Sequence, residues 1–125
     1  MWQSLFGSEA EILAAENAVG QDLYAEVVKQ VPQTEDAELQ AQMSHITTKL
    51  AQRVRGKGRT YQATVIEDAK PNAFALPGGY VFLTSSILDL CQRQKDQIAF
   101  IVAHEMAHIV KQHAMERIVA HSAVS

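Results

Sequence analysis

The chain has 125 residues, of which 47% are hydrophobic and 20% are charged, enough for one globular domain with a buried core. Its net charge of −3 at pH 7 argues against binding to nucleic acid or to an anionic membrane surface. The single cysteine, Cys91, excludes an intrachain disulfide, and its apolar neighbours indicate a small buried hydrophobic residue.

Neither a membrane span nor a signal peptide is predicted. No apolar run approaches the length needed to cross a bilayer. The first seven residues lack the basic region and the apolar stretch of a secretory signal. The simplest interpretation is a cytoplasmic protein without an integral membrane segment. A periplasmic or secreted protein whose signal peptide has been removed would have the same sequence.

The first half of the chain predicts two helices. Ser8 to Glu11 is a capping-box pattern, in which the Ser8 hydroxyl accepts from the Glu11 amide while Glu11 reaches back. Hydrophobic residues follow at helical spacing until Pro32 ends the first helix. Thr34 is the expected N-cap of the second helix. His45 lies beside the apolar stripe of that helix and is interpreted as a surface histidine rather than a metal ligand.

The hydrophobic pattern then changes from helical to alternating. Residues 55–59 predict a polar, Gly-rich turn with solvated basic side chains. Three short strands are expected at residues 60–68, 72–76 and 80–84. Between the last two, Pro77-Gly78-Gly79 predicts a turn or bulge that requires positive φ and a close approach of the backbone.

The last part of the chain predicts helices again. A short helix capped by Ser85 or Ser86 should precede a strongly apolar helix from about Asp96 to Ile118. The order helix, helix, small three-stranded sheet, helix predicts an α+β fold. Since no other element is left to cover the last helix, the sheet should pack on it, with the functional site in a groove between them. We expect a single domain over residues 1–125 that is incomplete at its C-terminus.

The segment His104-Glu105-Met106-Ala107-His108 fits the pattern H-E-x-x-H within this last helix. Residues four apart share a helix face, so both imidazoles can reach one Zn²⁺ at roughly 2.0–2.1 Å. Glu105 can then accept a proton from a metal-bound water. The helix is expected to be buried, and a metal would satisfy the polar side chains within it. In the alternative interpretation, both histidines bond to backbone carbonyls and Glu105 pairs with a neighbour.

A second motif accompanies the first. The run Asn72-Ala73-Phe74-Ala75-Leu76-Pro77-Gly78-Gly79 precedes H-E-x-x-H by about 25 residues. With both motifs, the chain resembles the gluzincin zinc metallopeptidases of the CAAX prenyl protease and HtpX type, which include soluble bacterial members. The resemblance covers most of the chain and implies a zincin-like fold and peptide or unfolded protein substrates.

The resemblance also implies roles for individual residues. His104 and His108 would be the zinc ligands, and Glu105 would be the general base. His113 matches a histidine often found after the motif. It lies about 140° around the helix from His108, so we interpret it as a supporting residue and not a ligand. An edge strand would pair with extended substrate. The predicted substrate-binding residues are Asn72, Ala73, Phe74, Ala75, Gly78 and Gly79.

The chain departs from this family in its third metal ligand, which would be a glutamate in an E-x-x-A-D context on a later helix. No such motif follows His108. Glu116 is twelve residues from His104, roughly 18 Å along a helix, and cannot reach the same ion. The chain alone is therefore expected to be weakly active or inactive. Without residues to cover them, three apolar side chains would be exposed or used in self-association: Ile118, Val119 and Val124.

Three functions compete on this sequence. The first is a zinc metalloendopeptidase, complete or truncated, that hydrolyses peptide bonds with a zinc-bound water and Glu105 as general base. The second is a non-catalytic homologue that retains a peptide-binding groove. The third is a helical interaction protein in which the H-E-x-x-H pattern arose by chance.

Overall fold

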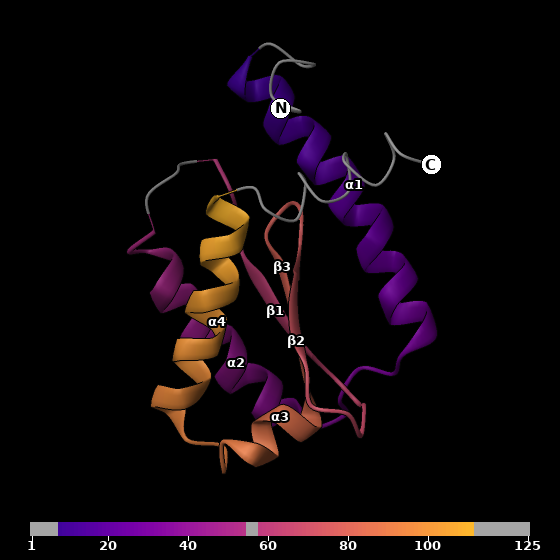
Figure 1. Cartoon of the computed structure of the whole chain (residues 1–125), viewed down its shortest axis with the longest axis vertical. Coiled ribbons are helices and arrows are strands. Elements are labelled where there is room, and N and C mark those ends of the chain that lie inside the picture. The colour runs from indigo at the N-terminus through magenta and orange to yellow at the C-terminus, as the bar shows by residue number, and fades with distance from the viewer. Residues whose placement is uncertain (1–7, 55–57, 112–125) are drawn as a thin grey trace.

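The computed structural model describes residues 8–54 and 58–111 of the chain (Figure 1). These residues form a mixed fold of helices around a small sheet, which confirms the predicted α+β class. The elements in chain order are α1 (Glu9–Gln30), α2 (Ala37–Ala51), β1 (Gln62–Ile66), β2 (Ala73–Leu76), β3 (Tyr80–Thr84), α3 (Ser85–Leu90) and α4 (Lys95–Val110).

The sheet has the strand order β1-β3-β2, so β3 is its central strand. It pairs in parallel with β1 and antiparallel with β2, and Val81 is the partner of Ala63 on one side and of Ala75 on the other. The three strands lie close to the predicted positions. Within the described sheet β2 is an edge strand, because its pairing is with β3 alone.

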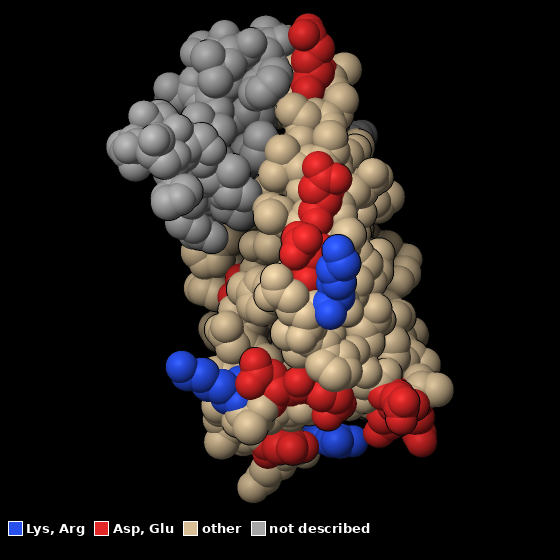
Figure 2. Space-filling view, turned by 90° about the vertical axis from the view of Figure 1, so that its right-hand side faces the viewer, with Lys and Arg blue, Asp and Glu red and all other residues tan. Residues whose placement is uncertain are grey.

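Helices cover both faces of the sheet (Figure 1). Helices α2 and α4 pack on one face, where their apolar residues form the core with Ala63, Val65, Val81 and Leu83. The last helix therefore packs on the sheet as predicted, although α2 shares that face. The opposite face carries α1, whose acidic side chains lie along the surface in Figure 2.

Aromatic side chains join α1 to the sheet. Tyr24 lies with its ring centroid 4.9 Å from that of Tyr80 and 5.5 Å from that of Phe82, and Phe74 stacks on Phe82 at 5.2 Å. Because neighbouring residues of a strand point to opposite faces, Phe74 is directed toward α1 while Ala73 and Ala75 face the core under α4.

In the turn between β2 and β3 the backbone packs closely against other segments of the chain. Gly78 and Gly79 have φ values of +87° and +95°, which side-chain-bearing residues rarely adopt. A Cβ on Gly79 would lie 1.8 Å from the carbonyl oxygen of Thr60, and one on Gly20 would lie 1.9 Å from that of Pro77. The prediction of a turn with positive φ and close backbone approach is confirmed.

The first helix begins as predicted, but the second does not. The Ser8 Oγ accepts from the Glu11 amide at 3.1 Å. Helix α2 is capped by Asp36, which accepts from the Leu39 amide at 3.0 Å, so Thr34 is not its N-cap. The reason is tertiary: the Thr34 amide donates to the Val65 carbonyl at 2.9 Å, which keeps this residue in extended backbone beside β1.

The short helix α3 also starts differently. Thr84, the last residue of β3, accepts from the Ile87 amide at 3.3 Å and is the N-cap in place of Ser85 or Ser86. The strand therefore leads into the helix without an intervening loop. Cys91, at the end of this helix, is half-buried where full burial was expected.

Helix α4 starts at Lys95 and ends at Val110. Lys111 is its C-cap, and residues 112–118 of the predicted helix lie outside the described residues, as do His113 and Glu116 and the three apolar residues assigned to self-association. Within the described part of the chain, no helix combines the length and apolar character required to cross a bilayer.

Candidate metal centre

The apolar stripe of α4 determines which way its H-E-x-x-H motif faces. Ile98, Val102, Met106 and Ile109 are each no more than 2% exposed and pack into the core. Their spacing of three and four residues keeps them on one side of the helix. The other side faces solvent, and Phe100 there is 73% exposed.

The two histidines and the glutamate of the motif lie outside the buried stripe. His104 is exposed, whereas Glu105 and His108 are half-buried. The expectation that they lie at the centre of a buried helix is therefore wrong. The apolar sequence of α4 could not show that the sheet and α2 would cover only part of its circumference.

The two histidines converge as their spacing predicts. Their Nε2 atoms are 3.2 Å apart, and their ring planes lie at 88° with centroids 4.8 Å apart. Two nitrogens bound to a tetrahedral zinc at roughly 2.0–2.1 Å would be about 3.3 Å apart. At 3.2 Å the two Nε2 atoms are within hydrogen-bond distance of each other, and their separation is also close to that of two ligand nitrogens on one zinc ion.

In the part of the chain that the structure describes, no third side chain of a metal-binding type joins the two histidines. Residues 8–54 and 58–111 contain no group of three or more histidine, cysteine, aspartate or glutamate side chains placed to hold a metal ion. His45, which was interpreted as a surface residue, is exposed on α2. Metal binding by His104 and His108 therefore stays a prediction, without a third ligand among the described residues.

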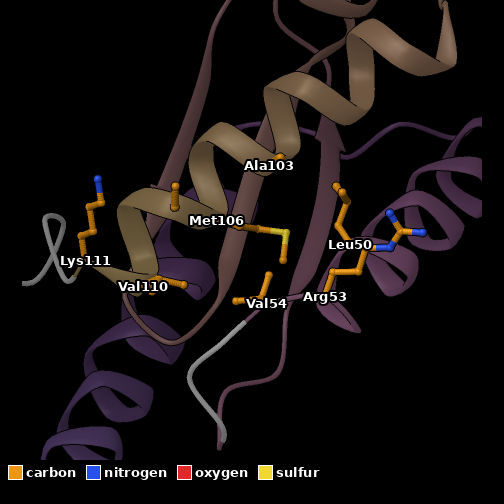
Figure 3. Close-up of a pocket in the computed structure, with 8 residues that line it drawn as sticks. Leu50, Arg53, Val54, Ala103, Met106, Val110 and Lys111 are labelled. Carbon is orange, nitrogen blue, oxygen red and sulfur yellow. The ribbon is translucent and has the colours of Figure 1, made fainter.

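A separate apolar groove lies on the other flank of α4, toward the end of α2 (Figure 3). Successive residues of an α-helix are about 100° apart around its axis. By this spacing, the histidine pair lies roughly 130° around α4 from the α4 residues that line the groove. The candidate metal centre therefore lies on the flank away from α2. This groove has a volume of about 320 Å³ and is lined by Leu50, Arg53, Val54, Ala103, Met106, Ala107, Val110 and Lys111.

The predicted substrate-binding residues fall into two groups. Ala73 and Ala75 belong to β2, on which α4 packs, and face the core beneath that helix. Asn72 is exposed and directly precedes the strand, and its backbone amide donates to the Thr84 Oγ1 at 2.9 Å. Ala73 and Ala75 thus lie on a strand that packs under the motif helix, and Asn72 directly precedes that strand.

The other three predicted substrate-binding residues are directed elsewhere. Phe74 stacks on the α1 side of the sheet. Gly78 and Gly79 are buried in the turn, next to the backbone of Glu16 and of Thr60. In this structure the two glycines shape the course of β2, and a contact of these residues with substrate remains a prediction.

Sequence reasoning missed a buried ion pair that supports this turn. Arg59 donates from Nε and Nη2 to the two carboxylate oxygens of Glu16, at 3.0 and 2.9 Å. Both side chains are at most 8% exposed, so the expectation that this basic segment is solvated is wrong for Arg59. The hydrogen bonds to Glu16 raise the pKa of the guanidinium. The sequence did contain a signal for this pair. Glu16 lies four residues before Gly20, so both share a helix face, and a glycine on that face indicates close packing.

Tyr61 lies next to this pair. Burial raises the pKa of its phenol, and its hydroxyl has no hydrogen-bond partner among the described residues. The ring packs against the core under α2 and α4. The segment between Arg59 and β1 therefore links the ion pair on the α1 side to the core on the other side.

Comparison with known proteins identifies one family. The profile described as Peptidase family M48 matches residues 34–125, about three quarters of the chain. The chain is 46% identical over 65 residues to the mitochondrial metalloendopeptidase OMA1 of Schizosaccharomyces pombe. It is 46% identical over 63 residues to that of Saccharomyces cerevisiae and 38% identical over 53 residues to that of Bos taurus.

These matches cover 52%, 49% and 42% of this chain, but only 19%, 18% and 10% of the three relatives. The chain thus spans a small part of the curated relatives it matches. All three relatives are named as mitochondrial, which contradicts the cytoplasmic assignment. That assignment considered only the secretory signal peptide, whereas mitochondrial targeting relies on segments with different features.

Proposed function

Because the chain belongs to peptidase family M48, we propose that it carries the metal-binding part of a zinc-dependent metalloendopeptidase. The observation that carries this proposal is the 3.2 Å separation of the His104 and His108 Nε2 atoms on α4. The names of the three relatives, all metalloendopeptidases, support the same reaction class.

In this proposal each residue of the motif has a separate task. His104 and His108 would hold the ion through their ring nitrogens. When bound, zinc supplies Lewis acidity, which lowers the pKa of water and polarises a carbonyl. The Glu105 carboxylate accepts a proton from the attacking water and returns it to the leaving amine nitrogen. His113 stays a predicted supporting residue, since it lies outside the described part of the chain.

The same proposal assigns the substrate to the outer edge of β2. In the described sheet this strand pairs with β3 alone, so its other edge offers backbone donors and acceptors to an added strand. An extended peptide or a segment of unfolded protein can bind there by main-chain hydrogen bonds. Ala73 and Ala75 contribute small side chains on the side of α4, and the buried glycine turn holds the strand in place.

Zinc binding by the 125-residue chain is the direct test. Calorimetric titration should show one Zn²⁺ per chain for the unaltered protein and no stoichiometric binding for His104→Ala or His108→Ala. His45→Ala is the matched control, because His45 is an exposed helical histidine on α2. Equal binding by His104→Ala and the unaltered protein would contradict the two-histidine centre.

A further inference from the structure

Phe100 is the most exposed large hydrophobic side chain of α4, at 73%. It lies four residues before His104, so the two side chains occupy the same helix face. Their rings are nearly parallel, with an interplanar angle of 20° and centroids 6.5 Å apart. This separation is within the 4.5–7 Å over which aromatic rings attract one another.

The contact between Phe100 and His104 bears on what fixes the orientation of the His104 ring. Metal-binding histidines ordinarily donate their second ring N–H to a carboxylate, a carbonyl or a water, which fixes the orientation of the ring. Among the described residues, the His104 ring lies against the rings of His108 and Phe100. His108 is its partner in the pair, so Phe100 is the neighbour in a position to orient the ring.

We propose that Phe100 is a positioning residue for the metal centre, which holds the His104 imidazole in its ligating orientation by ring stacking. This inference rests on the proposed zinc site. A ring held in place before the metal arrives loses less rotational freedom on binding, which increases affinity.

The expected size of the effect is modest. Aromatic pairs contribute enough for a 2- to 10-fold change in an equilibrium constant, by the usual conversion of free energy to affinity. We therefore expect Phe100→Ala and Phe100→Leu to weaken Zn²⁺ binding by about 2- to 10-fold. Phe100→Tyr, which keeps the ring, should bind Zn²⁺ as tightly as the unaltered protein.

The experiment is a competition titration of Zn²⁺ between the 125-residue chain and a chromophoric chelator, with helix content checked by circular dichroism. Leu90→Ala is the matched control, since Leu90 is 70% exposed on α3, outside the motif helix. Its affinity should equal that of the unaltered protein. Leu and Tyr at position 100 both keep a bulky side chain, so their comparison stands even if Phe100→Ala loses helix.

The outcomes separate the two proposals. Unchanged affinity in Phe100→Ala or Phe100→Leu, or affinity in Phe100→Tyr as weak as in Phe100→Leu, would overturn the role of the ring while leaving the zinc site intact. An unaltered protein that binds no Zn²⁺ would overturn the metal centre and the role of Phe100 together. An equal loss in Leu90→Ala would show a general effect of exposed apolar residues and would also overturn the inference.

Discussion

Glu105 follows one histidine of the pair directly and precedes the other by three residues, which places it beside both on α4. The residue is half-buried on the helix. The role proposed for Glu105 as general base requires its carboxylate to lie within hydrogen-bond reach of the reacting water. Its neighbours differ in exposure because α4 turns a single stripe toward the core.

Glu105→Gln should separate catalysis from metal binding. The amide has nearly the same size but cannot accept a proton, so we expect Zn²⁺ binding to be retained and peptide cleavage to fall by about 10²–10⁴-fold. Cleavage of a fluorogenic peptide should be measured with this chain and with a longer reading frame that contains it. Cleavage by Glu105→Gln at the unaltered rate would remove Glu105 from the mechanism. Peptide binding without turnover in the unaltered chain, both alone and with a supplied C-terminal segment, would favour the non-catalytic homologue that retains a peptide-binding groove.

At the scale of elements, the turn between β2 and β3 connects the edge strand β2 to the central strand of the sheet. Gly79 has a φ of +95°, and a Cβ added to it would lie 1.8 Å from the carbonyl oxygen of Thr60. Gly58 has a similar φ of +97°, but the atom nearest to its Cβ position is the flexible Leu13 Cδ1 at 2.9 Å. The two glycines therefore differ mainly in whether a side chain would meet rigid backbone.

This difference predicts unequal costs of substitution. Gly79→Ala should lower the free energy of unfolding by about 2–5 kcal/mol, from positive φ and a backbone clash together. Gly58→Ala should lower it by only about 1–2 kcal/mol, from φ alone. Urea denaturation of the two variants measures both values. Equal losses would show that the close approach to Thr60 relaxes easily.

At the scale of the whole molecule, the Glu16–Arg59 pair joins α1 to the chain that enters the sheet, across 43 positions of sequence. Together with the aromatic contacts of Tyr24, it attaches α1 to the face opposite the motif helix. A buried charge without its partner is costly, whereas replacing both partners by apolar residues removes two desolvation penalties at once.

Glu16→Leu alone should therefore destabilise the protein by about 3–5 kcal/mol, because it leaves the Arg59 guanidinium buried and unpaired. The double variant Glu16→Leu with Arg59→Leu should recover a substantial part of this loss. Unfolding free energies of the two single variants and the double variant form a cycle that measures the coupling. Strict additivity in that cycle would mean that the two side chains do not depend on each other.

Several features could be predicted because they depend on residues close in sequence. The Ser8 cap, the glycine turn and the shared face of His104 and His108 each follow from spacings of at most four residues. The predicted N-cap of α2 was wrong because a distant segment of the chain pairs with that residue. Thr34 pairs with Val65 and so cannot begin α2, although its own sequence context favours a cap.

The sequence by itself therefore determined the helices, the strands and the metal-binding spacing of the motif, since local sterics and periodicity govern them. Only the tertiary structure decided the strand order β1-β3-β2, the burial of Glu16 with Arg59, and the exposure of Phe100 and His104. These features depend on which distant segments meet, and hydrophobicity alone does not specify the partner of an apolar surface.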